Sequence, residues 1–229
     1  MRRALVLIVG LVFSGMWWGE TPDARTPAAP VEPALVRFLS RPDEPLTAYR
    51  AVRHMEAENA RFNLRGALDA MTTLSADGHF EYTILRETGS DYIRSKVLKS
   101  VLQNEEKLFA TTDPSRAALT TSNYDLNGAE PAEPGVVRLF AKPRRREISL
   151  VDGFVFVRQD DADLVRVEGR LAKNPSFWTT RVDVVRRYDR VGGIRVPVRL
   201  DTTAQIRMAG ASTLSMVYDY EMVNGVAVK

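Results

Sequence analysis

The chain has 229 residues, and its 45% apolar and 27% charged residues are a globular composition that can support a sizeable core. The absence of cysteine excludes disulfides, thiolate metal sites, thiol nucleophiles and lipidation of an N-terminal cysteine. The net charge of +3 includes Arg2 and Arg3, and both signs alternate along the remaining chain. A nucleic-acid partner, which needs a concentrated basic face, is therefore not expected.

Residues 1–19 have the character of an export signal. Two arginines precede an uncharged, mostly apolar run of 15 residues, Ala4–Trp18, which suits a signal peptide and is short for a membrane span of about 20 residues. No small-residue cleavage pattern follows, and the two tryptophans that end the run would suit a bilayer interface. A signal peptide and an uncleaved signal anchor both stay open. Residues 20–33 are rich in proline and alanine and are predicted to be a linker.

A single β domain is predicted for residues 34–229, beginning with a short helix at Ala34–Leu39. Alternating apolar residues predict three strands, Tyr49–Asn59, Arg65–Ser75 and His79–Thr88. The longest helix is predicted at Asp91–Phe109, with an apolar stripe on one side and charges on the other. We expect it to cover the sheet and call it the lid helix. Its stripe consists of Ile93, Val97, Val101, Leu102 and Leu108.

The second half of the chain is predicted to be mostly strand, after a short helix that Pro114 begins. Asp152-Gly153 is predicted as a hairpin turn, because this dipeptide readily adopts the positive φ angles of a type I′ turn. The strands predicted here are Val136–Ala141, Ile148–Val151, Phe154–Val157, Leu164–Leu171, Phe177–Tyr188, Ile194–Thr203, Ala204–Met208 and Thr213–Met222.

The predicted fold class is mainly β, with about eleven strands and about three helices. The strands follow one another too closely for parallel crossovers, so the sheet should be antiparallel. A sheet of this size must curl to cover its apolar face, which predicts a large curved sheet or unclosed barrel covered by helices.

A curved sheet under a helical lid would enclose an apolar space that suits a hydrophobic ligand. Aromatic and methionine side chains of several strands are candidates to line it, although they could equally fill an ordinary core. The candidate lipid-binding residues are Phe154, Phe156, Trp178, Met216, Tyr218 and Tyr220.

The segment Asp163–Trp178, which reads DLVRVEGRLAKNPSFW, is followed by Val182–Tyr188 and Gly193–Val198. Together with the order of the predicted elements, these segments resemble the outer-membrane lipoprotein-sorting superfamily, the LolA/LolB-like fold, among exported bacterial proteins. The resemblance implies an unclosed β-barrel capped by helices, with an apolar cavity for acyl chains. It also implies an arginine on an early strand that holds the lid shut, and Arg50 and Arg53 lie in that region.

No catalytic motif is found, and His54 and His79 have no partners at a metal or triad spacing. Asp160, Asp161 and Asp163 could supply oxygen ligands to Ca²⁺, but a solvated turn is favoured because the glycine and glutamate of an EF-hand are missing. The basic stretch Lys142–Arg146 could meet anionic headgroups or an acidic partner, or simply discourage edge pairing, which we favour. Neither a metal nor a cofactor is predicted.

These observations favour a non-catalytic periplasmic carrier for a lipid or for the acyl chains of a lipoprotein. The alternative is a protein-interaction or sensing module of the cell envelope, anchored in the inner membrane by residues 1–19. In both cases the N-terminal segment is the expected contact with a membrane.

Overall fold

The computed structural model describes residues 33–41, 43–111 and 114–228. The predicted signal segment 1–19 and residues 20–32 of the predicted linker lie outside the described residues. The described part forms one eleven-stranded antiparallel sheet. Its strands are β1 (Tyr49–Asn59), β2 (Leu64–Leu74), β3 (Phe80–Gly89), β4 (Tyr124–Glu133), β5 (Val136–Pro143), β6 (Val151–Arg158), β7 (Leu164–Leu171), β8 (Thr179–Val191), β9 (Ile194–Ile206), β10 (Gly210–Val223) and β11 (Val226–Ala227).

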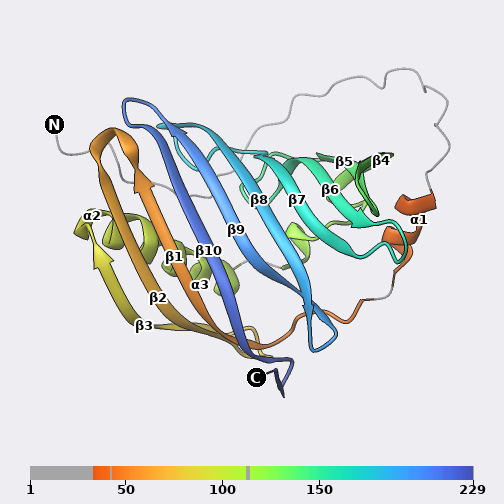
Figure 1. Ribbon diagram of the computed structural model, residues 1–229, viewed down its shortest axis with the longest axis horizontal. Helices are drawn as coiled ribbons and strands as arrows, with labels where there is room; N and C mark the ends of the chain where they lie inside the picture. The colour runs from red at the N-terminus through yellow and green to blue at the C-terminus, as the bar shows by residue number, and fades with distance from the viewer. Residues whose placement is uncertain (1–32, 42, 112–113, 229) are drawn as a thin grey trace.

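The strand order is β3-β2-β1-β10-β9-β8-β7-β6-β5-β4, and β11 pairs with β10. From β4 to β10 each strand lies beside its predecessor, whereas β1 is inserted between β2 and the last long strand. Figure 1 shows the sheet as a strongly curved layer whose two edges do not meet. The predicted large, curved and unclosed antiparallel sheet is confirmed.

The described residues also form helical segments. They are α1 (Pro33–Ser40), η1 (Ala60–Phe62), α2 (Asp91–Ile93), η2 (Arg94–Leu98), α3 (Lys99–Thr111) and η3 (Pro114–Ala117). Of these segments, α1 and the lid helix lie against the sheet. The continuous segment α2–η2–α3 is the predicted lid helix, and it crosses behind β1, β2 and β3 in Figure 1. Helix α1 lies at the far end of the sheet, near β4.

One face of the sheet is apolar and carries both helical covers. Burial alternates strictly along β1, and the residues at odd positions from Tyr49 to Asn59 are buried. Under the lid helix they meet apolar residues of β2 and β10, and under α1 a second cluster joins Phe38 to Leu139 and Val155. We call this the inner face of the sheet.

Among the predictions for the second half, one turn and two strands are wrong, and one of these strands is Ile148–Val151, of which only Val151 lies in a strand. Asp152-Gly153 does not turn, because β6 runs through it, and the chain instead turns before Leu150. The close approach of β7 explains the glycine, since a side chain at Gly153 would overlap the carbonyl oxygen of Glu168. Ala204–Met208 is no separate strand but contains the end of β9. Strand β4 was not predicted, because Gly128 and Pro131 interrupt its pattern.

Candidate functional site

The lid helix packs its apolar side chains onto the inner face of β1, β2 and β10. Ile93, Leu98 and Leu102 are buried there against Met55 and Met216. Val97 and Val101 are partly buried around the same cluster, and Leu108 is exposed. Four of the predicted stripe residues, Ile93, Val97, Val101 and Leu102, therefore contribute to this packing.

The π-helical turn η2 explains why Leu98 joins the cluster. Its wider hydrogen-bonding pattern rotates the following residues relative to a regular α-helix. A fixed helical period placed Val97 in the predicted stripe and left out its neighbour Leu98. The buried face of the lid helix is thus broader than the predicted stripe.

Arg53 on β1 lies in the middle of this apolar layer and pairs with Glu105 of the lid helix. Its side chain is only 1% exposed, and its Nη2 donates a hydrogen bond to Glu105 Oε1 at 2.9 Å. The same nitrogen donates to the hydroxyl of Tyr49. The guanidinium carbon lies 4.8 Å from the ring centre of Tyr218 and 5.3 Å from that of Phe80. A buried charge is thus matched by one carboxylate and surrounding aromatic rings.

The groups around Arg53 keep its guanidinium charged. Burial alone would lower the pKa of Arg53, but its interactions with Tyr218, Glu105 and Tyr49 raise it well above the ordinary value. Burial also raises the pKa of Tyr49, Tyr218 and Tyr220. The cation therefore persists throughout the physiological pH range, and the surrounding tyrosines stay neutral.

Beyond the edge of the lid helix, the inner face is open at Arg186 on β8. Register pairing places Arg186 opposite Leu200 of β9 and Val167 of β7, both of which point to the inner face. The side chain of Arg186 is exposed, and Tyr188 is the main group that raises its pKa. The inner face thus offers a covered apolar part and an uncovered part with one cation.

The structure separates the six candidate lipid-binding residues into three places. Met216, Tyr218 and Tyr220 of β10 lie on the inner face, as their pairing with odd-numbered residues of β1 requires. Phe154 and Phe156 lie on the opposite face of β6, since it is Val155 that faces the inner cluster. Trp178 lies in the loop before β8, at one end of the sheet.

The aromatic residues on the face opposite the inner face are covered by arginine side chains rather than by a helix. The rings of Phe154 and Phe140 lie 4.8 Å apart, and the guanidinium of Arg138 lies 5.0 Å from the ring centre of Phe154. Arg166 covers Phe156 at 3.9 Å. These residues form a layer on the outer face, separate from the lid helix.

Sequence reasoning missed several residues of the inner site. Glu105 was assigned only to the charged side of a helix, and Arg186 was not singled out. Arg53 was suspected only through the resemblance to a family. One local signal was present, because Arg53 falls in the buried phase of an otherwise clean alternation along β1.

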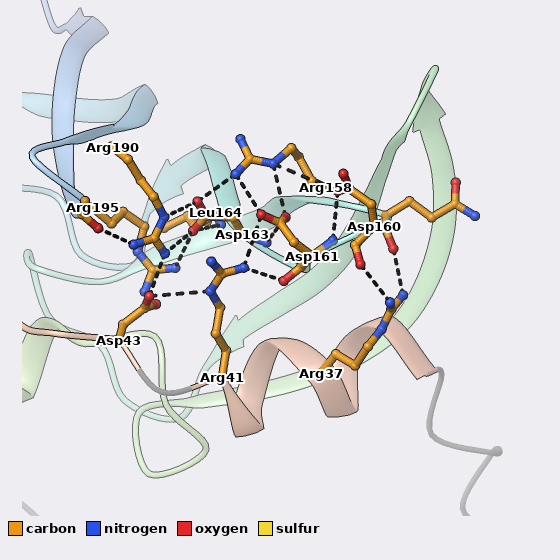
Figure 2. Close-up of polar contacts among 12 residues, drawn as sticks. Arg37, Arg41, Asp43, Arg158, Asp160, Asp161, Asp163, Leu164, Arg190 and Arg195 are labelled. Atoms are coloured by element: carbon orange, nitrogen blue, oxygen red, sulfur yellow. Dashed lines mark hydrogen bonds and ion pairs between the residues drawn. The ribbon is translucent and has the colours of Figure 1, made fainter.

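The predicted aspartate cluster belongs to an ion-pair network that ties α1 and the following segment to two turns of the sheet (Figure 2). Asp163 accepts hydrogen bonds from Arg190 at 2.7 Å and Arg158 at 2.8 Å. Asp43 bridges Arg190 and Arg195 from the other side. Arg37 donates to the carbonyl oxygens of Gln159 and Asp160.

This network replaces the predicted solvated turn at Asp163, whose side chain is almost completely buried. Burial would raise the pKa of Asp163, but the hydrogen bond from Arg190 and the charges of Arg190, Arg41 and Arg195 lower it overall. Across residues 33–41, 43–111 and 114–228, no group of acidic or histidine side chains is arranged to hold a metal ion. Arginine side chains pair with these carboxylates.

His54 forms a surface contact with Asp69, at 2.9 Å between Nδ1 and Oδ1. Two solvent-open hollows, of about 480 and 240 Å³, are lined by other segments and not by the lid helix. Side chains fill the interface between the lid helix and the sheet, where Leu98 and Leu102 have no exposed surface.

No protein-family model and no curated protein matches the chain. Among solved structures, a DUF1329 family protein from Desulfovibrio piger ATCC 29098 is similar, with 12% identity, a TM-score of 0.43, and coverage of 85% of this chain and 92% of the other. A LolA superfamily protein from Nitrosomonas europaea is similar with 10% identity, a TM-score of 0.41, and coverage of 83% and 94%. Both likenesses are at the level of the fold, as is the LolA-like resemblance seen in the sequence. Within the described residues, no helix is long and apolar enough to span a membrane.

Proposed function

We propose that this protein is a non-catalytic carrier that binds the acyl chain of a lipid or lipidated partner between its curved sheet and the lid helix. The observation that carries the proposal is the buried ion pair between Arg53 and Glu105, which joins these two layers inside apolar and aromatic surroundings. Each layer contributes one charged partner. Separation of the layers therefore breaks one specific contact together with non-directional apolar packing.

The chemistry of the interface supports an acyl chain as the occupant. Met55, Leu68 and Met216 face the lid helix from three adjacent strands, and Leu98 and Leu102 face them from the helix. An acyl chain inserted between the two layers offers apolar contacts to both, so it can replace the contacts between these leucines and the sheet at little cost in hydrophobic free energy. Methionine side chains adapt readily to such a change of partner.

The uncovered part of the inner face supports a polar group at one end of the ligand. Arg186 lies there beside Tyr188, and its charge interacts with Tyr218 and Glu105 of the covered part. A phosphate or ester group next to this cation would keep its charge or dipole near water while the acyl chain enters under the lid helix. We therefore propose Arg186 as the residue that meets the headgroup end.

The proposal is tested by native mass spectrometry of the protein purified from its own host, and by displacement of a fluorescent fatty acid. We expect bound lipid in the first measurement and competition by phospholipid in the second. Glu105→Gln should speed exchange of the fluorophore at least fivefold, whereas Glu106→Gln, an exposed neighbour on the same helix, should not change it. A protein that never carries lipid and does not bind the fluorophore would refute the carrier function.

Export to the periplasm is part of the same proposal and is tested separately. Cell fractionation and N-terminal sequencing of the native protein distinguish the two forms. A soluble periplasmic protein that lacks residues 1–19 fits a mobile carrier. An intact N-terminus in the inner-membrane fraction, together with the absence of lipid, would favour the anchored interaction module instead.

A further inference from the structure

We infer that one end of the sheet is a docking surface for an anionic phospholipid bilayer. Three turns lie at this end: residues 60–63 between β1 and β2, residues 172–178 between β7 and β8, and residues 207–209 between β9 and β10. We call them the rim turns. They lie along the upper rim of the sheet in Figure 1, at the end opposite the C-terminus.

The rim turns are held together by hydrogen bonds. The backbone nitrogen of Arg207 donates to the carbonyl oxygen of Trp178 at 2.8 Å, which joins the second and third turns. Asn59, just before the first turn, is buried, and its side-chain amide donates to the carbonyl oxygen of Ala209 at 3.0 Å. The three turns therefore present their side chains as one surface.

Large apolar side chains point into solvent from these turns. Phe177 is 73% exposed, Met208 72%, Phe62 49% and Trp178 38%. Single exposed apolar residues are ordinary, but four on adjoining turns form a patch that indicates an interaction. Met208 has a φ of 67°, in the left-handed region that an unbranched apolar residue rarely adopts. The chain thus keeps a methionine at a turn position that favours glycine or asparagine.

Positive charges accompany this patch, and the rim turns contain no acidic residue. Arg61, Lys173 and Arg207 lie in the turns, Lys142 lies at the end of β5, and Arg146 lies in the connection to β6. This connection adjoins the second rim turn, because Ala172 donates to the carbonyl oxygen of Leu150. All five cations are exposed, and none is paired with a carboxylate of the described residues.

The opposite end of the sheet has the reverse arrangement. There the arginines of the β6–β7 and β8–β9 turns are bound to Asp43, Asp161 and Asp163 (Figure 2). These arginines are therefore neutralised by carboxylates, whereas Arg61, Lys173 and Arg207 of the rim turns are not, within the described part of the chain.

The shape and chemistry favour a bilayer as the occupant. The exposed side chains stand on turn tips rather than in a groove, so they suit insertion into a deformable apolar phase. The guanidinium of Arg207 lies 4.6 Å from the ring centre of Phe177, and the rings of Phe177 and Trp178 are 5.7 Å apart. Aromatic rings favour the bilayer interface, and arginine beside them can reach anionic headgroups while its stem stays in apolar surroundings. Each such cation strengthens binding to an anionic surface about fivefold.

Because the chain contains no cysteine, a single introduced cysteine can be labelled at a chosen position. Phe177→Cys and Met208→Cys variants of the full chain each carry one polarity-sensitive NBD label, and Val226→Cys carries it on β11 at the other end. We expect vesicles of phosphatidylethanolamine and phosphatidylglycerol to shift the emission of the first two labels to the blue and at least double it. The label at position 226 should not respond. Because each label reports its own surroundings, insertion of residues 1–19 alone would not produce this pattern.

A matched pair of charge variants tests whether the rim turns prefer anionic lipid. In the Met208→Cys background, Lys173→Glu should weaken the response at least fivefold, whereas Lys107→Glu, an exposed site on the lid helix, should change it less than twofold. Silent labels at 177 and 208, or an equal response at 226, would overturn the docking surface. An equal response to phosphatidylcholine vesicles would overturn its preference for anionic lipid. Neither result depends on whether the inner face carries an acyl chain.

Discussion

Gly153 of β6 and Gly169 of β7 lie directly opposite each other in the antiparallel pair. A β-carbon on Gly153 would overlap the carbonyl oxygen of Glu168 and stand 2.6 Å from the α-carbon of Gly169. We therefore expect Gly153→Ala to force the two strands apart and to lower the free energy of unfolding by about 3 kcal/mol, as overpacking does. Urea denaturation followed by circular dichroism measures this loss.

The control for this prediction is Gly135→Asn in the β4–β5 turn. Gly135 has a φ of 74°, which asparagine tolerates, and an added β-carbon would meet no atom within 4 Å. Its stability should change by less than about 1 kcal/mol. Equal midpoints for Gly153→Ala and the unchanged protein would contradict the close approach of β6 and β7.

The ion pair between Arg53 and Glu105 should be strongly coupled. Glu105→Gln leaves a buried guanidinium without its carboxylate and should cost about 2 kcal/mol, while the double variant Arg53→Met/Glu105→Gln should recover part of this loss. A double-mutant cycle in urea should give a coupling energy on the order of 2 kcal/mol. A coupling energy near zero would mean that the pair does not join the lid helix to the sheet.

Burial along the lid helix should decide the effect of leucine truncation. Leu102 has no exposed surface, and Leu108 on the same helix is about half exposed. Leu102→Ala should therefore lower the free energy of unfolding by about 3 kcal/mol, and Leu108→Ala by less than about 1 kcal/mol. Thermal unfolding of the two variants side by side measures the difference, and equal losses would place the wrong face of the helix against the sheet.

The ion pairs of Asp163 should make the free energy of unfolding depend on pH in the acidic range. The folded-state pKa of Asp163 lies below its ordinary value of 3.8, so its stabilising effect is complete above about pH 5 and is lost as the pH falls through the lowered pKa. Asp163→Asn should cost about 3 kcal/mol near neutral pH, and this difference from the unchanged protein should shrink below pH 4.

Urea unfolding between pH 7 and pH 2 measures this dependence. Asp77→Asn, an exposed carboxylate in the β2–β3 turn, provides the control and should show a small difference at every pH. A constant cost of Asp163→Asn down to pH 2 would indicate that the substitution acts through packing rather than through charge.

Strands with a clean alternation could be predicted from the sequence, and those without one could not. β1 was predicted with its observed bounds because every second residue is buried under a helix. β4 was missed because its residues lie at the sheet edge, where few are buried and a glycine and a proline are tolerated. Gly153 was misread because a glycine that allows two strands to approach has the same local sequence as one that allows a turn.

The inner site could be predicted only in part, since its charged residues are defined by distant partners. Tyr218 and Met216 share a face by simple alternation, and that part was predicted. Glu105 meets Arg53 only because the lid helix crosses β1, and no local pattern specifies that crossing. Phe154 and Tyr218 have similar surroundings in sequence, but the register across β7, β8 and β9 places them on opposite faces.

The position of β1 has a consequence for the time course of folding. β1 ends at Asn59, but its partner β10 begins only at Gly210, so their pairing joins residues more than 150 positions apart in the chain. Until β10 has been synthesised, β1 keeps one edge unpaired and the inner face of β1–β3 lacks the neighbour that carries Met216. Such long-range pairing is slow and leaves strand edges open to aggregation. A chain that stops before residue 210 therefore cannot complete the half of the sheet that the lid helix covers.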